Sequence, residues 1–170
     1  GGGALTVGGT FDFNGGNAAI NGNVVINGTL SSGGDAMQMT GANTTLSGTG
    51  DVVDTTIEID ATGVSVPVGA DLAFDANSEI DVAANVNPAS LTVNGTLDGT
   101  AQAAGDRIIR VSTGGSLTVG ATGIIDAPNS RLEVRDGASA TNDGTITIGE
   151  LRGRAGGTTP VFTQGNNSTL

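Results

Sequence analysis

The sequence predicts an all-β fold, in the form of a parallel β-solenoid, and three observations support it. The chain of 170 residues contains 30 glycines and only 2% aromatic residues, so bulky core side chains are scarce. Its apolar residues are mainly Ala, Val, Ile and Leu, interrupted by Gly, Thr and Asn, which disfavours long helices. A short apolar motif also recurs along the chain. Recurrence at a regular period is typical of solenoids.

The repeated motif is seen best by aligning residues 24–30 (VVINGTL) with residues 91–97 (LTVNGTL). Stronger and weaker copies begin at residues 5, 24, 44, 64, 91, 117 and 140, so that successive copies are separated by 19 to 27 residues. A period of this length suits one turn of a parallel solenoid. The sequence therefore predicts about seven coils over residues 1–157, followed by an extended tail over residues 158–170 that caps the last coil or pairs with a neighbouring subunit.

Each copy has the pattern of a short strand and a corner. In the copy that starts at Leu91, Leu91 and Val93 are expected to point inward and Thr92 outward, because side chains alternate along a strand. The next glycine, Gly28 or Gly95, is expected to supply the positive φ of a tight corner. Further alternating strands are predicted at residues 57–60, 79–82, 131–135 and 145–148. The competing fold is an antiparallel β-sandwich, which has no need to repeat one heptapeptide.

Two of these copies resemble a known family. Residues 115–123 (GSLTVGATG) and 91–97 (LTVNGTL) are similar to the passenger β-helices of bacterial autotransporters and filamentous-haemagglutinin-like adhesins. The resemblance covers about residues 4–151. It implies a right-handed, roughly triangular solenoid that is exported to a bacterial surface. Its motifs identify an architecture and no ligand.

Composition excludes several classes of site and partner. The chain has no cysteine and no histidine, so disulfides, thiolate metal sites and imidazole bases are excluded. A net charge of −11 disfavours a nucleic-acid partner, because phosphates would be repelled. No apolar run approaches the ~20 residues of a transmembrane helix. We therefore expect no nucleic acid and no membrane insertion.

Acidic pairs are the candidates for catalysis or metal binding. They are Asp51 with Asp54, Glu58 with Asp60, Asp71 with Asp75, and Glu79 with Asp81. Without Lys, His, Trp or Tyr, and with the arginines distant in sequence, these pairs are expected to be solvated acids on strand faces. We thus predict no enzymatic activity and no cofactor. The segments 33–35 and 47–51 approach a Ca²⁺-binding glycine-rich repeat without tandem copies, so a weak Ca²⁺ site stays an open alternative.

Charge is divided unevenly along the chain. Residues 1–106 contain twelve acids and no base, whereas residues 107–170 contain five acids and all six arginines. The segment 131–135 (RLEVR) is consistent with a solvated strand face, and equally with a contact surface.

The two ends of the predicted solenoid show no capping helix, which leaves strand edges open. Open ends of unlike charge favour head-to-tail association with other copies of the chain. The candidate assembly residues are Leu5, Val7, Phe11, Arg152, Arg154, Val161 and Phe162. We therefore predict a structural subunit of an extracellular bacterial filament or matrix. The alternative is an adhesin fragment at the cell surface that binds glycans or other surface proteins.

Overall fold

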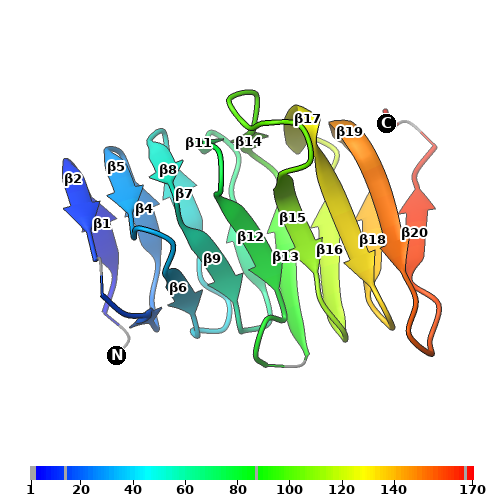
Figure 1. The fold of residues 1–170 in the computed structure, drawn as a ribbon, viewed down its shortest axis with the longest axis horizontal. Helices are drawn as coiled ribbons and strands as arrows, with labels where there is room; N and C mark the ends of the chain where they lie inside the picture. The colour runs from blue at the N-terminus through cyan, green and yellow to red at the C-terminus, as the bar shows by residue number, and fades with distance from the viewer. Residues whose placement is uncertain (1–2, 14, 87, 167) are drawn as a thin grey trace.

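The computed structural model describes residues 3–13, 15–86, 88–166 and 168–170. Within these residues it contains twenty strands and no helix, and every strand pair is parallel. The strands stack as a β-solenoid of about seven turns, with the two chain termini at opposite ends of the stack (Figure 1). The predicted parallel solenoid is confirmed, and the antiparallel sandwich is excluded.

The solenoid wall consists of three faces. Face 1 contains β1 (Leu5–Val7), β4 (Val24–Ile26), β7 (Leu46–Gly48), β10 (Val64–Val66), β13 (Ala89–Val93), β16 (Gly115–Val119), β18 (Ser139–Asn142) and β20 (Val161–Gln164). Face 2 contains β2 (Thr10–Asp12), β5 (Thr29–Ser31), β8 (Asp51–Val53), β11 (Asp71–Phe74) and β14 (Thr96–Asp98). Face 3 contains β3 (Ala18–Ile20), β6 (Ala36–Met39), β9 (Thr56–Ile59), β12 (Glu79–Val82) and β15 (Arg107–Val111).

Two longer strands join face 2 to face 3. The first part of β17 (Ile124–Arg135) pairs with β14, and its second part pairs with β15. The strand β19 (Thr145–Arg154) follows β17 around the same corner. Face 3 therefore ends at residues 150–154 of β19. Face 1 extends one strand further, because β20 in the predicted tail pairs with β18.

The register of face 1 follows the predicted repeat. The copies at residues 5 and 24 pair with each other, and those at residues 64, 91, 117 and 140 form a continuous row. Val24 of the second coil pairs with Leu46 of the third coil, two residues beyond the predicted start at Thr44. The bridge between Thr45 and Ser65 keeps the predicted spacing between the third and fourth coils. A local shift of two residues thus preserves which side chains point inward.

The core is a column of small aliphatic side chains inside the three faces. Ile26, Val93 and Val119 are fully buried, whereas the intervening Thr92 and Thr118 are half-buried on the outer surface. This matches the predicted inward and outward positions. Each coil covers the apolar surface of the previous one, so most core side chains with a coil on both sides are fully buried.

The corner glycines act differently from the prediction. Neither Gly28 nor Gly95 has a positive φ. Instead, a Cβ on Gly28 would lie 2.2 Å from the carbonyl oxygen of Gly9 in the preceding coil, and a Cβ on Gly50 would lie 2.1 Å from that of Gly28. These glycines are required because two coils approach so closely at this corner that no side chain fits between them.

Candidate functional site

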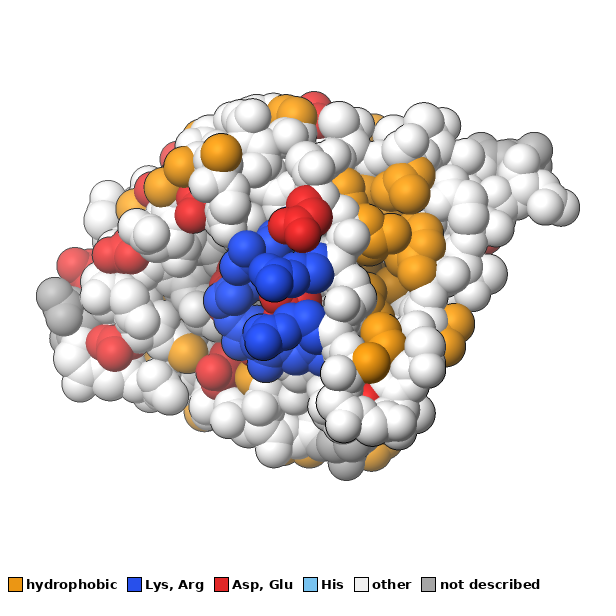
Figure 2. Space-filling view, turned by 45° about the vertical axis from the view of Figure 1, so that its right-hand side comes forward, with side chains coloured by type: hydrophobic (Ala, Val, Ile, Leu, Met, Phe, Trp, Pro, Cys, Tyr) orange, Lys and Arg blue, Asp and Glu red, His pale blue; other side chains and the backbone are white. Residues whose placement is uncertain are grey.

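All six arginines lie on face 3. They come in pairs from three neighbouring strands, namely β15, β17 and β19. Figure 2 shows them as one basic patch on the side of the molecule, with acidic side chains inside it and at its border. The solenoid thus converts the basic part of the sequence into a single surface, and we call this surface the arginine patch.

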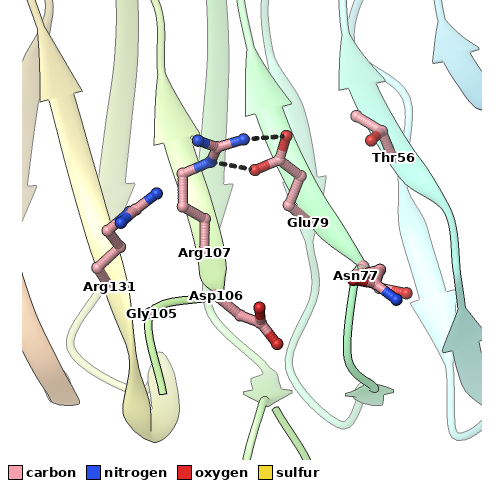
Figure 3. Close-up of a pocket in the computed structure, with 8 residues that line it drawn as sticks. Thr56, Asn77, Glu79, Gly105, Asp106, Arg107 and Arg131 are labelled. Carbon is pink, nitrogen blue, oxygen red and sulfur yellow. Dashed lines mark hydrogen bonds and ion pairs between the residues drawn. The ribbon is translucent and has the colours of Figure 1, made fainter. Parts of the chain in front are cut away.

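Two arginines of the patch bind the acids of β12. Arg107 donates to Glu79 through Nε at 2.5 Å and through Nη2 at 3.2 Å. Arg110 donates to Glu79 at 2.6 Å and to Asp81 at 2.8 Å. Ser112 adds a hydrogen bond of 2.7 Å to the other oxygen of Asp81. The result is a connected network across two coils, part of which is visible in Figure 3.

Burial and pairing shift the pKa values of two acids on face 3. Asp81 is 5% exposed, and this burial raises its pKa. The hydrogen bond from Ser112 and the positive charge of Arg110 act in the opposite direction but are outweighed. Glu133 is 1% exposed and accepts a hydrogen bond of 2.7 Å from Arg135. Burial also acts to raise the pKa of Glu133, but the hydrogen bond and charge of Arg135, helped by more distant arginines, outweigh it and lower the pKa.

The sequence interpretation of these acids as solvated and remote from the arginines is wrong for this network. Register places Asp81 beside Arg110, and Arg110 beside Glu133. About one coil of sequence separates each pair, so residues distant along the chain become nearest neighbours across the wall. The repeat period alone does not give this juxtaposition, because the copies at residues 64 and 91 are 27 residues apart whereas Asp81 pairs with Arg110, 29 residues on.

Several of the remaining acidic candidates have roles within the fold, whereas Asp51 and Asp71 are exposed on their strands, as predicted. Asp60 is buried, and both of its carboxylate oxygens accept hydrogen bonds from Asn85, which also donates to Glu58. Asp75 accepts from the backbone N–H of Asp54 at 3.1 Å and from a serine hydroxyl. Asp35, in the first glycine-rich segment, accepts from two backbone N–H groups of the preceding coil. Among the described residues, no group of three or more Asp or Glu has metal-binding geometry.

A polar hollow adjoins the arginine patch. Its volume is about 360 Å³, and its walls include Thr56, Asn77, Glu79, Asp106, Arg107 and Arg131. Figure 3 shows that these residues come from successive coils on face 3 and from the turns that precede their strands. The hollow contains both acidic and basic groups together with a hydroxyl and an amide, a set suited to binding a small polar molecule.

The predicted assembly residues occupy opposite ends of the solenoid. At the N-terminal end, Leu5 is half-buried and Val7 is covered, whereas Phe11 is 41% exposed and packs on Phe13 with ring centroids 6.1 Å apart. The other four members, at the C-terminal end, are Arg152 and Arg154 on β19 and Val161 and Phe162 on β20. The structure therefore groups the seven residues into two separate sets.

The C-terminal set borders an apolar hollow. Its volume is about 220 Å³, and it is lined by Leu151, Arg152, Pro160, Val161 and Phe162, among others. Figure 2 shows apolar side chains gathered beside the arginine patch. Sequence reasoning missed Leu151 and Pro160, because the two segments meet only through the corner between face 3 and face 1.

Comparison with known proteins yields no relative: no family model, no curated protein and no solved structure matches the chain. The described part of the chain also has no helix with the length and hydropathy needed to cross a bilayer.

Proposed function

We propose that this chain is a structural subunit of an extracellular bacterial filament or matrix, in which copies join head-to-tail through the solenoid ends. The observation that supports the proposal is the distribution of incompletely buried core residues. Leu5, Phe13 and Ile20 belong to the first coil, and Ile148 and Phe162 to the last turns. Each packs against the core and remains partly exposed, because no further coil covers it.

The backbone at both ends also has strand edges with which another copy could pair. Within the described residues, β1, β2 and β3 each pair with one strand of the second coil, and β20 pairs only with β18. A neighbour placed in the same parallel register would satisfy these open edges, and burial of apolar area contributes about 25 cal/mol per Å². The end-to-end contact would thus repeat the contact that already joins successive coils.

Charge would orient the subunits. The first coil contains one acid, Asp12, and no base, while Arg152 and Arg154 are exposed at the opposite end and form no ion pair with any described residue. Facing these ends together favours one polarity of addition. Replacing both arginines with glutamate is expected to slow filament growth most strongly at low salt, measured by light scattering at low and high ionic strength.

The sharpest test uses the first corner glycine. At this corner a Cβ points toward the preceding coil, and Gly9 has nothing within 4 Å because no described coil precedes it. Gly9→Ala should therefore fold normally but place a methyl group against the stacked neighbour. Because overpacking typically costs about 1–3 kcal/mol, we expect the critical concentration for polymerisation to rise by roughly tenfold or more.

The matched control is Gly8→Ala. Gly8 also has nothing within 4 Å, and the next coil carries an exposed Asn27 at the equivalent position, so a side chain is tolerated there. Assembly is measured by negative-stain microscopy and sedimentation. Equal polymerisation of the Gly9→Ala and Gly8→Ala proteins would exclude the N-terminal end as the interface. A parent protein that stays monomeric at high concentration, with or without Ca²⁺, would refute the filament proposal.

The second candidate function is an adhesin fragment that binds glycans or other surface proteins. The polar hollow on face 3 favours it, because this hollow lies on the side wall and needs no second subunit. A soluble monomer that binds a surface glycan would support this candidate over the filament.

A further inference from the structure

Arg131 has no counter-ion among the described residues. No described residue forms an ion pair or a side-chain hydrogen bond with it, and its Nε is buried without a partner. In the parallel register it lies beside Arg107 on one side and Glu150 on the other, yet Glu150 is exposed and does not bind it. Figure 3 shows the Arg131 side chain directed toward Arg107.

Two adjacent guanidinium groups favour the binding of an anion. Like charges on neighbouring strands repel each other, and Arg107 is only partly compensated because Glu79 is shared with Arg110. An oxyanion between Arg107 and Arg131 would relieve this repulsion and supply acceptors for the unpaired N–H groups. Carboxylates fit guanidinium groups especially well, through two parallel hydrogen bonds.

The opposite wall of the hollow selects the type of anion. Asp106 and Glu79 add negative charge there, which disfavours a ligand with several charges such as phosphate. Thr56 and Asn77 offer a hydroxyl and an amide, and together with the carboxylates they suit the hydroxyl groups of a sugar. The volume of about 360 Å³ also falls in the range of small-molecule sites, which is roughly 300–1,000 Å³.

We infer that the hollow binds a uronic acid, as a free sugar or as one unit of an acidic glycan, with its carboxylate between Arg107 and Arg131. The hydroxyl groups of the sugar then face Asn77 and Asp106, and the next unit of an acidic glycan faces Thr56. This site lies on the side wall, away from both solenoid ends, so it goes beyond the proposed assembly and does not depend on it. A protein that fails to form filaments is still expected to bind the sugar.

The test is a titration of the unmodified protein with sodium glucuronate, followed by amide chemical shifts in nuclear magnetic resonance spectra. Saturable shifts are expected at Asn77, Asp106 and Arg131, with glucose and acetate binding at least tenfold more weakly. A parallel titration with oligogalacturonate distinguishes a polymer segment from a free sugar as the preferred ligand, and saturation by either supports the inference. Equal effects of glucuronate and acetate, or no saturable shift with either uronate, would overturn it.

Three variants locate the site. Arg131→Gln leaves every ion pair of the network intact and is expected to weaken glucuronate binding tenfold or more. Arg154→Gln removes the same charge from the same face outside the hollow and should change binding less than twofold. Thr56→Val, a nearly isosteric change, should weaken oligogalacturonate but leave acetate unaffected. Equal binding by the Arg131→Gln and Arg154→Gln proteins would place the sugar elsewhere and refute the assignment.

Discussion

The corner between face 1 and face 2 provides the most specific test of the fold. At this corner in the sixth coil, a Cβ on Gly123 would lie 2.1 Å from the carbonyl oxygen of Val93 and 2.9 Å from a methyl of Val119. Ordinary contacts of this kind begin at 3.4 Å, so Gly123→Ala requires the two coils to separate by about 1.3 Å. Gly123 itself has no positive φ, which means that the steric contact alone opposes the alanine.

The cost follows from the bonds at this corner. Gly120 donates to Val93 at 2.8 Å, and Ile124 donates to Gly95 at 2.9 Å. Both would stretch beyond hydrogen-bonding range, at about 1 kcal/mol each, and overpacking adds about 1–3 kcal/mol. Alanine restricts the unfolded chain, which returns about 0.4–1 kcal/mol. We therefore expect a net loss of about 2–5 kcal/mol, a large part of the ~5–15 kcal/mol that stabilises a typical domain.

The assay is urea unfolding followed by far-ultraviolet circular dichroism at a concentration where the protein is monomeric. Gly123→Ala should lower the midpoint, whereas Gly9→Ala, at the same corner of the first coil, should leave it unchanged or raise it slightly. This opposite behaviour of two identical substitutions arises only if each coil packs against the one before it. A Gly123→Ala protein within about 0.5 kcal/mol of the parent would refute the close approach of the coils.

Three further predictions concern the core and the buried acids. Val93→Asp should prevent folding because it buries an unpaired charge, whereas Thr92→Asp should cost no more than about 0.5 kcal/mol, as measured by the same unfolding assay. The lowered pKa of Glu133 means that its stabilising contribution is complete above the ordinary value of 4.5 and is lost as pH falls. The Glu133→Gln protein should therefore be less stable than the parent at about pH 6, and this difference should shrink as the pH falls to about 3. The raised pKa of Asp81 has the opposite effect, because its stabilising contribution is present below the ordinary value of 3.8 and is lost as pH rises. Asp81→Asn should therefore gain stability relative to the parent as pH rises from about 3 to about 6. Parallel pH trends for these two variants would contradict the assigned burial and pairing.

The fold was predictable because a parallel solenoid is encoded by local repetition. An apolar–polar–apolar triplet fixes which side chains point inward, and the recurrence of that triplet fixes which residues stack. The copies at residues 91 and 117 align over five residues in the structure, as their sequences suggest. The role of the corner glycines was harder to infer, because a need for positive φ and a need for close approach both select glycine.

The arrangement of charges was only partly predictable. The sequence indicates that the arginines are confined to the last 64 residues, but it does not show that Glu79 and Asp81 of the fourth coil lie against Arg107 and Arg110 of the fifth. That contact depends on the exact register across β12 and β15, in which Asp81 pairs with Arg110. A one-residue error in register would direct these side chains to the opposite side of the wall.

The stacking rule that explains the interior also explains the ends. Along one inward row of face 2, Phe11 is 41% exposed, whereas Leu30 and Val52, which follow it in the next two coils, are fully buried. The three side chains differ little in apolar character, so their exposure differs because only Phe11 has no described coil before it. Within the described residues, the surface at the N-terminal end therefore resembles an interior surface that no coil covers. Among possible partners, the C-terminal coil of another copy offers both the parallel edge and the apolar hollow beside Val161 that such a surface requires.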